Sequence, residues 1–279
     1  MNKEAGYVMK CTVLGCMDES GLSLEVVAAV NDDSILKCNL MRSPLLKERG
    51  VPLHVQSGFV CASLAYNDAL LRCQADVVVF AHQDVYLPAG WEERLFKSIA
   101  LIERYDQDWA VLGVYGVTDQ GKHIGHVWSS GLQSMVGESF NEPVPVVSVD
   151  EVLIVIRRAS GLLFDSSLPG FHLYGTDIVQ AAISLGKKAY VVHAPLVHNS
   201  RPILYLGEDY FAAYKYLVRK WSRRLPIPNN VMVIMRPRLF YAWKRLRQKM
   251  NEYRYRNIPR RNFDRQLDCV GLAHRLGFE

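Results

Sequence analysis

The sequence predicts a three-layer α/β/α sandwich with a mostly parallel central sheet. Strand and helix patterns alternate from about residue 22 to residue 195, an order typical of α/β proteins with a parallel sheet. The segment Val77–Ala81 is apolar, uncharged and largely β-branched, as expected for a strand buried on both faces. It ends at His82-Gln83-Asp84, so a carboxylate is expected at the C-terminal edge of the sheet, where ligands bind in open α/β folds.

The other elements follow from periodicity and turn residues. Expected strands cover residues 22–30, 51–55, 76–81, 109–115, 144–157 and 188–193, and expected helices cover 35–48, 59–74, 92–105, 177–185 and 211–221. Pro44 is expected to interrupt the first helix. Thr176 is expected to cap the helix that starts at Asp177. Residues 116–141, rich in Gly, Ser and His, are expected to form a long active-site loop with short strands.

Composition excludes several classes of protein. The chain has 279 residues, of which 49% are hydrophobic and 22% charged. It contains no apolar run of transmembrane length and no signal-peptide core at its start, so we expect a cytoplasmic protein. The six cysteines form no CxxC motif, and we expect them to be reduced. No GxGxxG motif follows a strand and no P-loop motif is present, so neither a dinucleotide fold nor a P-loop is supported.

The charge is distributed unevenly. Residues 1–210 carry 16 Lys and Arg against 24 Asp and Glu, whereas residues 211–279 carry 17 against 4. We therefore expect an α/β domain over residues 1–209 and a basic, mainly helical C-terminal extension over residues 210–279. A basic, aromatic helix over 239–256 would either lie on an anionic membrane or pack on the acidic body. Nucleic-acid binding has no recognised module around it, and the last twenty residues show little pattern.

Side chains at strand ends are the first candidates for chemistry. Asp84 is either a ligand of a nucleotide or of a divalent metal that bridges a diphosphate, or it is an N-cap or turn residue before Pro88-Ala89-Gly90. His82 faces a phosphate or caps the strand. His198 lies just past the last expected strand and is the natural second metal ligand, whereas His193 is expected to be structural.

Acidic residues farther along the chain form a second group of candidates. Asp177 either stabilises a helix dipole or acts as a general base toward an acceptor hydroxyl. The aromatic residues in the segment 171–174 would form a platform for a sugar ring. Asp150 and Glu151 interrupt an apolar stretch, where an acid needs a partner or a role because burying a bare charge is costly.

These motifs, in their order and spacing, resemble the GT-A-fold glycosyltransferases of the bacterial, family-2-like type. The resemblance covers residues 23–225, and the matching segments are Val30-Asn31-Asp32, Ala65-Tyr66-Asn67, residues 80–85, residues 170–177, Gly186-Lys187-Lys188 and His198-Asn199-Ser200. It implies a GT-A-like fold, a nucleotide-sugar donor such as a UDP- or GDP-sugar, a divalent metal (Mn²⁺ or Mg²⁺), and a glycan or lipid-linked acceptor.

The resemblance also implies roles for individual residues. The expected donor-binding residues are Asn31, Asp32, Asn67, His82, Gln83 and Asp84, with Asp32 on the nucleotide base and His82-Gln83-Asp84 at the DxD position. The expected metal ligands are Asp84 and His198. Asp177 would be the base of an inverting displacement, and the expected acceptor-binding residues are Asp150, Glu151, His172 and Tyr174.

Two positions depart from the family pattern. His82 stands in place of the first Asp of DxD, and Thr176 stands in place of the Glu of the usual ED pair. The alternative is therefore a non-catalytic nucleotide-sugar or glycan-binding protein on the same fold. A nucleotidyltransferase is disfavoured, because no Gly-rich, basic phosphate loop lies near the N-terminus. The resemblance further implies polysaccharide biosynthesis, in the cytoplasm or on the inner face of the membrane.

Overall fold

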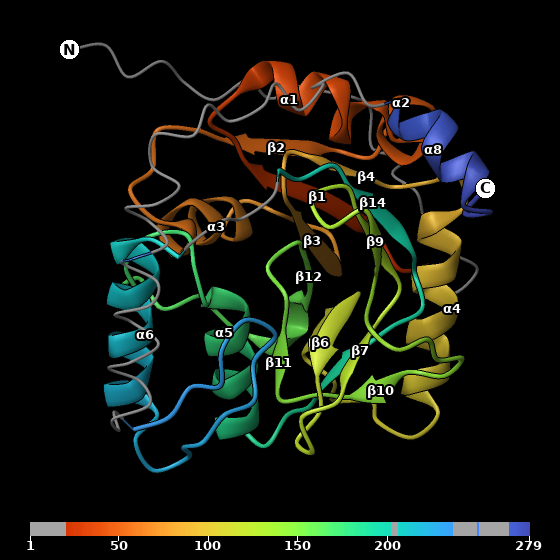
Figure 1. Cartoon of the computed structure of the whole chain (residues 1–279). Coiled ribbons are helices and arrows are strands. Elements are labelled where there is room, and N and C mark those ends of the chain that lie inside the picture. The colour runs from red at the N-terminus through yellow and green to blue at the C-terminus, as the bar shows by residue number, and fades with distance from the viewer. Residues whose placement is uncertain (1–20, 202–205, 237–249, 251–267) are drawn as a thin grey trace.

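The structure is a computed structural model, and it describes residues 21–201, 206–236, 250 and 268–279. A seven-stranded sheet crosses the centre of the molecule, with helices on both faces (Figure 1). In spatial order its strands are β10 (Val144–Pro145), β13 (Ala189–Val191), β5 (Val111–Gly113), β12 (Leu153–Arg157), β3 (Val77–Ala81), β1 (Leu24–Ala29) and β2 (Leu53–Gln56). The predicted three-layer α/β/α sandwich is confirmed.

The sheet is mostly parallel, as predicted, with two strands reversed. β1 pairs in parallel with β2 and β3, and β13 pairs in parallel with β5. β12 lies antiparallel between β3 and β5, and β10 lies antiparallel to β13 at the edge. The prediction of one strand over residues 144–157 was wrong. The segment is broken into β10, β11 (Ser148–Val149) and β12, because a turn at Glu151 and Val152 interrupts the strand pairing. β11 and β12 keep the same direction, antiparallel to residues 111–117.

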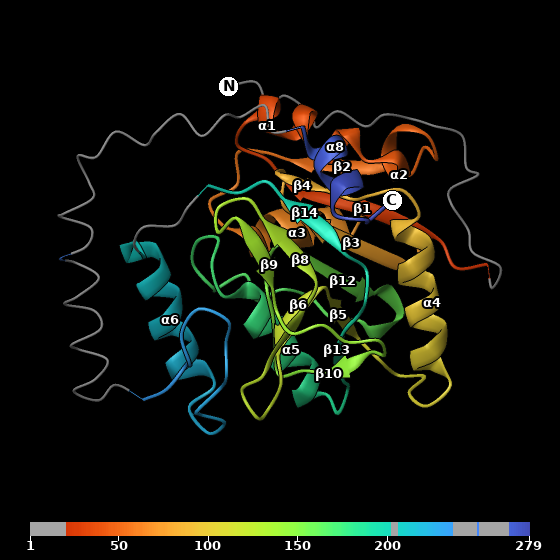
Figure 2. The ribbon, with the colours of Figure 1, turned by 45° about the vertical axis from the view of Figure 1, so that its right-hand side comes forward.

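Alternating side chains of the buried strands divide the core between two helical layers. Val27 of β1 packs in the cluster that contains α3 (Ala62–Leu70), α5 (Tyr174–Ser184) and α6 (Glu208–Lys220). Its neighbours Val26 and Ala28 pack in the other cluster, with α1 (Asp33–Cys38), η1 (Leu40–Arg42), α2 (Pro44–Lys47) and α4 (Trp91–Glu103). Figure 2 shows α4 and the pair α5 and α6 on opposite sides of the sheet. Pro44 begins α2, a position where its missing N–H costs nothing.

Much of the predicted long loop, residues 116–141, consists of paired strands. β6 (Tyr115–Val117), β7 (His123–Gly125) and β11 form one small sheet. β8 (Val127–Ser129) and β9 (Ser134–Val136) join β4 (Val85–Tyr86) and β14 (Leu196–His198) in another. The short strands that were expected within this segment are confirmed. A further turn of helix, η2 (Arg158–Ser160), follows β12.

The C-terminal residues from 268 onward form a helix that the sequence pattern did not indicate. α8 (Cys269–Arg275) packs against β4 and β14, with Leu272 and Phe278 beside Tyr86 and Val197. The Tyr86 hydroxyl donates a hydrogen bond to Glu279 Oε1 at 2.6 Å. The strands β4 and β14 are therefore covered by a segment that lies far away in the sequence (Figure 2).

Other sequence predictions are met only in part by the described residues. The basic helix expected over 239–256 lies outside them, apart from residue 250. α6 crosses the expected boundary at residue 209 and packs in the same core as α5, and the division into two regions stays a prediction. The four cysteines within the described ranges are free thiols. In those ranges no helix combines the length and the apolar character needed to cross a bilayer.

Candidate metal and donor site

Three side chains that can bind a metal ion meet where β3 ends. One ligand atom each from His82, Asp84 and His198 lies within 4.8 Å of the others. His82 and Asp84 follow β3 directly. His198 closes β14, and the antiparallel pairing of β14 with β4 sets it opposite Val85 and so beside Asp84. His198 Nε2 is 3.3 Å from Asp84 Oδ1, and the two imidazole rings are 5.7 Å apart.

The electrostatics of this group favour an ionised carboxylate. Burial would raise the pKa of Asp84, but the charge and hydrogen bond of His198, with a smaller effect of His82, outweigh it and hold that pKa far below its usual value. Burial likewise opposes protonation of His198, yet Asp84 raises its pKa overall. For His82, burial prevails and its pKa is lowered. The site thus combines a carboxylate with a neutral imidazole, both of which are metal ligands.

A cavity of about 420 Å³ opens beside these residues. It is lined by Ala29, Val30, Asn31, Gln56, Gly58, Phe59, Ala65, Tyr66, His82, Gln83, Asp84, Phe171 and Tyr174. Gln83 fixes one wall: its Oε1 accepts from the backbone N–H groups of Asn31 and Asp32 at 3.1 and 3.2 Å, and its Nε2 donates to Asn31 Oδ1 at 2.6 Å. The loops that end β1 and β3 are therefore held together at the edge of the sheet where ligands bind.

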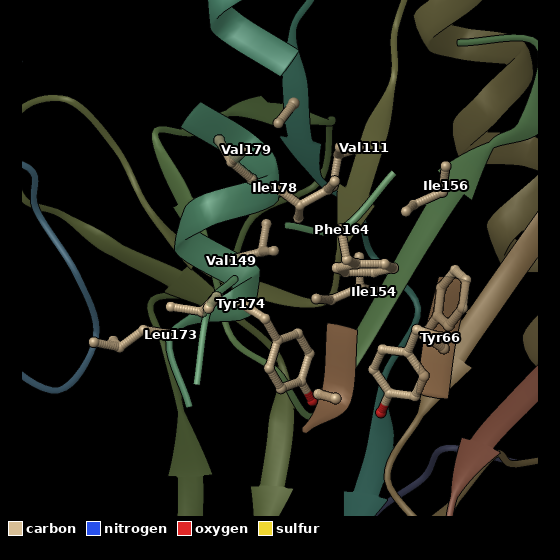
Figure 3. Close-up of a cluster of buried hydrophobic side chains, with 14 of the residues drawn as sticks. Tyr66, Val111, Val149, Ile154, Ile156, Phe164, Leu173, Tyr174, Ile178 and Val179 are labelled. Atoms are coloured by element: carbon tan, nitrogen blue, oxygen red, sulfur yellow. The ribbon is translucent and has the colours of Figure 1, made fainter. Parts of the chain in front are cut away.

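Two residues of the cavity lining, Tyr66 and Tyr174, belong to a cluster of buried aromatic residues. The rings of Tyr66 and Tyr174 meet edge to face at 5.5 Å, and Phe80 and Phe164 pack against Tyr66. Figure 3 shows the hydroxyls of Tyr66 and Tyr174 on the same side of the cluster. The Tyr174 hydroxyl is 3.1 Å from His82 Nε2. Burial raises the pKa of Tyr66 to about 12, so its hydroxyl stays protonated and can donate a hydrogen bond.

An acidic turn borders the same group. The backbone N–H of His82 donates to the carbonyl of Val152 at 3.1 Å, which brings the turn Asp150-Glu151 alongside. The Tyr174 hydroxyl also donates to the carbonyl of Glu151 at 3.3 Å, and Glu151 Oε1 accepts from the N–H of Gly175 at 3.3 Å. Burial, together with the charge of Asp150, raises the pKa of Glu151 to about 8.

The structure does not bring Asp177 into this group. Its side chain is buried, with Oδ2 2.8 Å from Lys220 Nζ and Oδ1 accepting from Trp221 Nε1 at 2.8 Å. The predicted cap at Thr176 was wrong. α5 begins three residues earlier, after Leu173 in the left-handed region, and Thr176 lies inside the helix, where its hydroxyl accepts from Asn229 Nδ2 at 2.7 Å.

Two predicted donor-binding residues have structural partners. Asp32 caps α1 by accepting from the N–H groups of Ser34 and Ile35. The side chain of Asn67 joins α3 to the backbone of Phe164, with one bond of 2.7 Å to its carbonyl and one of 2.8 Å from its N–H.

His172 and His193 had different predicted roles, and the structure gives the contacts of both. His172, expected to bind the acceptor, has its Nε2 3.2 Å from Asp209 Oδ2 and its ring against Tyr210. His193, expected to be structural, packs its ring against His126 and Phe140.

Sequence reasoning missed part of the site. It placed His82 among the donor-binding residues but not among the metal ligands, although its spacing to Asp84 was visible. It also missed Gln56, Phe59 and Tyr66 of the cavity lining. Tyr66 lies in the matching segment Ala65-Tyr66-Asn67, although no role was assigned to it. No local motif marks Gln56 or Phe59, because they come from separate parts of the chain that only the fold brings together.

Comparisons with known proteins found one curated relative in sequence and several similar solved structures. No family model matches the chain. A curated protein from Fuscovulum blasticum, named "ATP synthase subunits region ORF 6", is 31% identical over 170 residues, which are 58% of this chain and 66% of that protein. Its name describes a genomic region and indicates no activity.

Three solved structures align with this chain at TM-scores under 0.5. GalNAc-T7 with UDP, GalNAc and Mn²⁺ has a TM-score of 0.49 and 13% identity over 74% of this chain and 50% of that one. Staphylococcus aureus TarS 1–349 has a TM-score of 0.42 and 13% identity over 86% and 73%. The mannosyltransferase PcManGT from Pyrobaculum calidifontis, in complex with GDP-Man and Mn²⁺, has a TM-score of 0.41 and 10% identity. The match covers 90% of this chain and 75% of that one.

This chain spans under two thirds of the curated relative and half of the GalNAc-T7 chain.

Proposed function

We propose that this chain is a metal-assisted glycosyltransferase that moves a sugar from a nucleotide-sugar donor to an acceptor hydroxyl. The observation that carries the proposal is the convergence of His82, Asp84 and His198 beside a cavity of about 420 Å³ at the ligand-binding edge of the sheet. That volume lies in the range of small-molecule sites. A UDP- or GDP-sugar needs both a cavity and a partner for its diphosphate charge, and this edge supplies both.

The donor set fits a divalent transition-metal ion. Two imidazoles and one carboxylate suit Mn²⁺ better than Mg²⁺, since Mg²⁺ is bound almost wholly through oxygen. His82, Asp84 and His198 would hold the ion. When bound, the ion neutralises the charge that develops on the departing diphosphate. The close approach of His198 to Asp84 keeps the carboxylate ionised and oriented toward the other ligands.

The cavity walls would position the donor. Asn31 and Gln83 present a rigid amide pair at the mouth of β1, where a nucleotide base can be held by hydrogen bonds. We place the nucleotide there and the sugar over Tyr66 and Tyr174, whose hydroxyls face the same side of the aromatic cluster (Figure 3). Asp32 would act through its backbone and its cap of α1 rather than as a free carboxylate.

We assign the general base to Glu151 rather than to Asp177. Asp177 is bonded to Lys220 and Trp221 in the interior, away from the metal ligands. Glu151 stands on the turn beside His82, and its pKa is raised to about 8. The fraction of Glu151 that is ionised is therefore a stronger base than an ordinary carboxylate, with a pKa close to the pH at which general bases work. Glu151 would take the proton of the acceptor hydroxyl in an inverting displacement.

The acceptor would enter past the acidic turn and the segment before α5. Phe171 is 43% exposed and lines the cavity, which suits a sugar platform. Asp150, His172 and Tyr174 would complete the acceptor side. An acceptor linked to lipid, a role in polysaccharide biosynthesis and a place on the inner membrane surface are part of the same proposal, supported by the basic composition of residues 211–279.

The alternative is a nucleotide-sugar or glycan-binding protein without turnover. The pairing of Asp177 with Lys220 and Trp221 favours it, because the acid expected to act as base is engaged elsewhere. In that case the chain would bind donors but release no nucleotide.

A screen of UDP- and GDP-sugars with and without Mn²⁺ separates the two functions. We expect Mn²⁺-dependent thermal stabilisation by one donor and nucleotide release from it, both lost in Asp84→Asn. Asp119→Asn, at an exposed turn of the same fold, is the matched control and should keep both. Stabilisation without nucleotide release would support the binding protein, and full turnover by Asp84→Asn would refute the metal assignment.

A further inference from the structure

A second cluster of metal-binding side chains lies at the opposite end of β1. Glu25 stands near the start of this strand, whereas the donor cavity begins at Ala29 and Asn31 beyond its end. One ligand atom each from Glu25, His54 and Cys73 lies within 4.8 Å of the others. None of these three residues belongs to the cavity lining. The cluster is therefore separate from the proposed active site.

The fold explains why these three side chains meet. β1 and β2 pair in parallel with Val27 beside His54, so Glu25 and His54 point to the same face of the sheet as Val27. That face is covered by α3, and Cys73 follows the end of α3. The cluster thus joins the edge strand β2, the inner strand β1 and the helix above them.

Hydrogen bonds hold the carboxylate in place. Glu25 Oε1 accepts from the backbone N–H groups of Gln74 and Ala75 at 2.9 and 3.0 Å. Its other oxygen, Oε2, is 2.5 Å from His54 Nε2. The side chains of Glu25 and His54 are 13% and 16% exposed, and Cys73 is 2% exposed. The position of Glu25 is therefore fixed before any ligand arrives, while Glu25 and His54 stay partly exposed to solvent.

We propose that Glu25, His54 and Cys73 form a Zn²⁺ site. A thiolate, an imidazole and a carboxylate are the three ligand types that Zn²⁺ takes in proteins, and four-coordinate Zn²⁺ completes its shell with water when three come from the chain. The thiolate also selects against Mg²⁺ and Mn²⁺, which prefer oxygen. This site and the site at Asp84 would therefore take different metals.

Binding has a defined proton balance. Burial, followed by the charge of Glu25, raises the pKa of the Cys73 thiol far above its usual value, so the free protein carries the S–H form. Zn²⁺ displaces the thiol proton as the Zn–S bond forms. The hydrogen between His54 Nε2 and Glu25 Oε2 must also leave that contact, either to His54 Nδ1 or to solvent, when both side chains bind the ion. Arg158, whose Nε donates to the carbonyl of Ala75 at 2.8 Å, stays outside the ligand set.

The test uses the full chain after removal of metal with a chelator. Co²⁺, added as a spectroscopic probe for Zn²⁺, should give a thiolate-to-cobalt charge-transfer absorption that saturates at one Co²⁺ per chain and that Zn²⁺ abolishes. Cys73→Ser should lose the absorption. The matched control is Cys61→Ser, a buried thiol at the other end of α3, and it should keep the absorption, as should Asp84→Asn.

Two further variants keep the proposal open to refutation if Cys73→Ser does not fold. His54→Gln should lower Zn²⁺ affinity by more than about tenfold, since even outer partners of a metal site are worth that much, and should lose the stabilisation by Zn²⁺. The double variant Cys11→Ser/Cys16→Ser should bind as the wild type does. Absence of a thiolate absorption in the wild type, or its loss only in the double variant, would overturn the proposal.

Discussion

The clearest test of the site is to replace Asp177 and to measure both stability and turnover, because a structural residue and a general base give opposite results. If this residue is structural, its replacement should cost stability and leave turnover intact. Asp177 is 2% exposed and its two carboxylate oxygens are each bonded at 2.8 Å, one to Lys220 and one to Trp221. The change is Asp177→Ala, with the milder Asp177→Asn beside it and the exposed Asp119→Asn as control.

The magnitude follows from these contacts. Removing one partner of a buried ion pair costs about 3–5 kcal/mol, because the remaining charge is left without compensation. Lys220 keeps a second bond, to Asp165 Oδ2 at 2.7 Å, and is 26% exposed, so the low end applies and we expect a loss of about 3 kcal/mol. At about 2–4 °C per kcal/mol for a large domain, the melting temperature should fall by about 6–12 °C.

Asp177→Asn should lose less. The amide oxygen can still accept from Trp221, and only the charge opposite Lys220 is removed, which leaves a loss of about 1–2 kcal/mol. Asp119→Asn should stay within about 0.5 kcal/mol of the wild type.

Thermal unfolding and donor turnover, measured on the same samples below the melting transition, decide the matter. We expect the order of stability wild type, Asp177→Asn, Asp177→Ala, with nucleotide release per folded molecule unchanged within about twofold, since a structural residue makes no contact that differs in the transition state. If Asp177→Asn melts with the wild type but loses turnover by about 100-fold or more, the size expected for a general base, then Asp177 is the base and the assignment to Glu151 fails.

Three further predictions concern the acidic turn. Glu151→Gln should reduce donor transfer by about 10²–10⁴ with little loss of melting temperature, and unchanged transfer would exclude it as the base. Because the pKa of Glu151 is raised to about 8 from 4.5, the folded state keeps a proton that the unfolded state has lost, so stability should fall as pH rises from about 4.5 to 8; urea titrations at several pH values should show a flatter slope in Glu151→Gln. Gly175→Ala should destabilise the chain by about 1–3 kcal/mol, because its added methyl would lie 2.5 Å from the carbonyl oxygen of Val149; a stability equal to the wild type would mean that the turn and α5 can separate.

Local pattern predicted the sheet and its helices well, because a buried strand is visible in the sequence as a short run of apolar residues. The run Val77–Ala81 is buried throughout and lies in the middle of the sheet, as predicted. Polar residues that interrupt an apolar segment were harder to interpret. Asp150 and Glu151 were included within one strand, whereas they lie at a turn that interrupts the pairing between β11 and β12. A turn without Gly or Pro gives little signal in the sequence.

The sequence predicted the site residues that follow strands. It did not predict the direction of a side chain on a helix, because that direction depends on the residue at which the helix begins. Asp84 and His198 meet because β4 and β14 pair, and both were expected at strand ends. Asp177 was expected to face the acceptor from a helix N-terminus. A left-handed Leu173 starts α5 earlier than the pattern indicates, which turns Asp177 toward Lys220, and no spacing rule reports a contact with a residue 43 positions away.

The position of α8 links two parts of the chain that have no motif in common. Phe278 and Leu272 pack on Tyr86 and Val197, each next or close to a ligand of the candidate metal. Thermodynamic coupling is reciprocal: if the packing of α8 on these strands strengthens cation binding at Asp84, a bound cation must in return make the opening of α8 less favourable. Hydrogen exchange of the backbone amides in α8 would therefore report whether a cation is bound at Asp84.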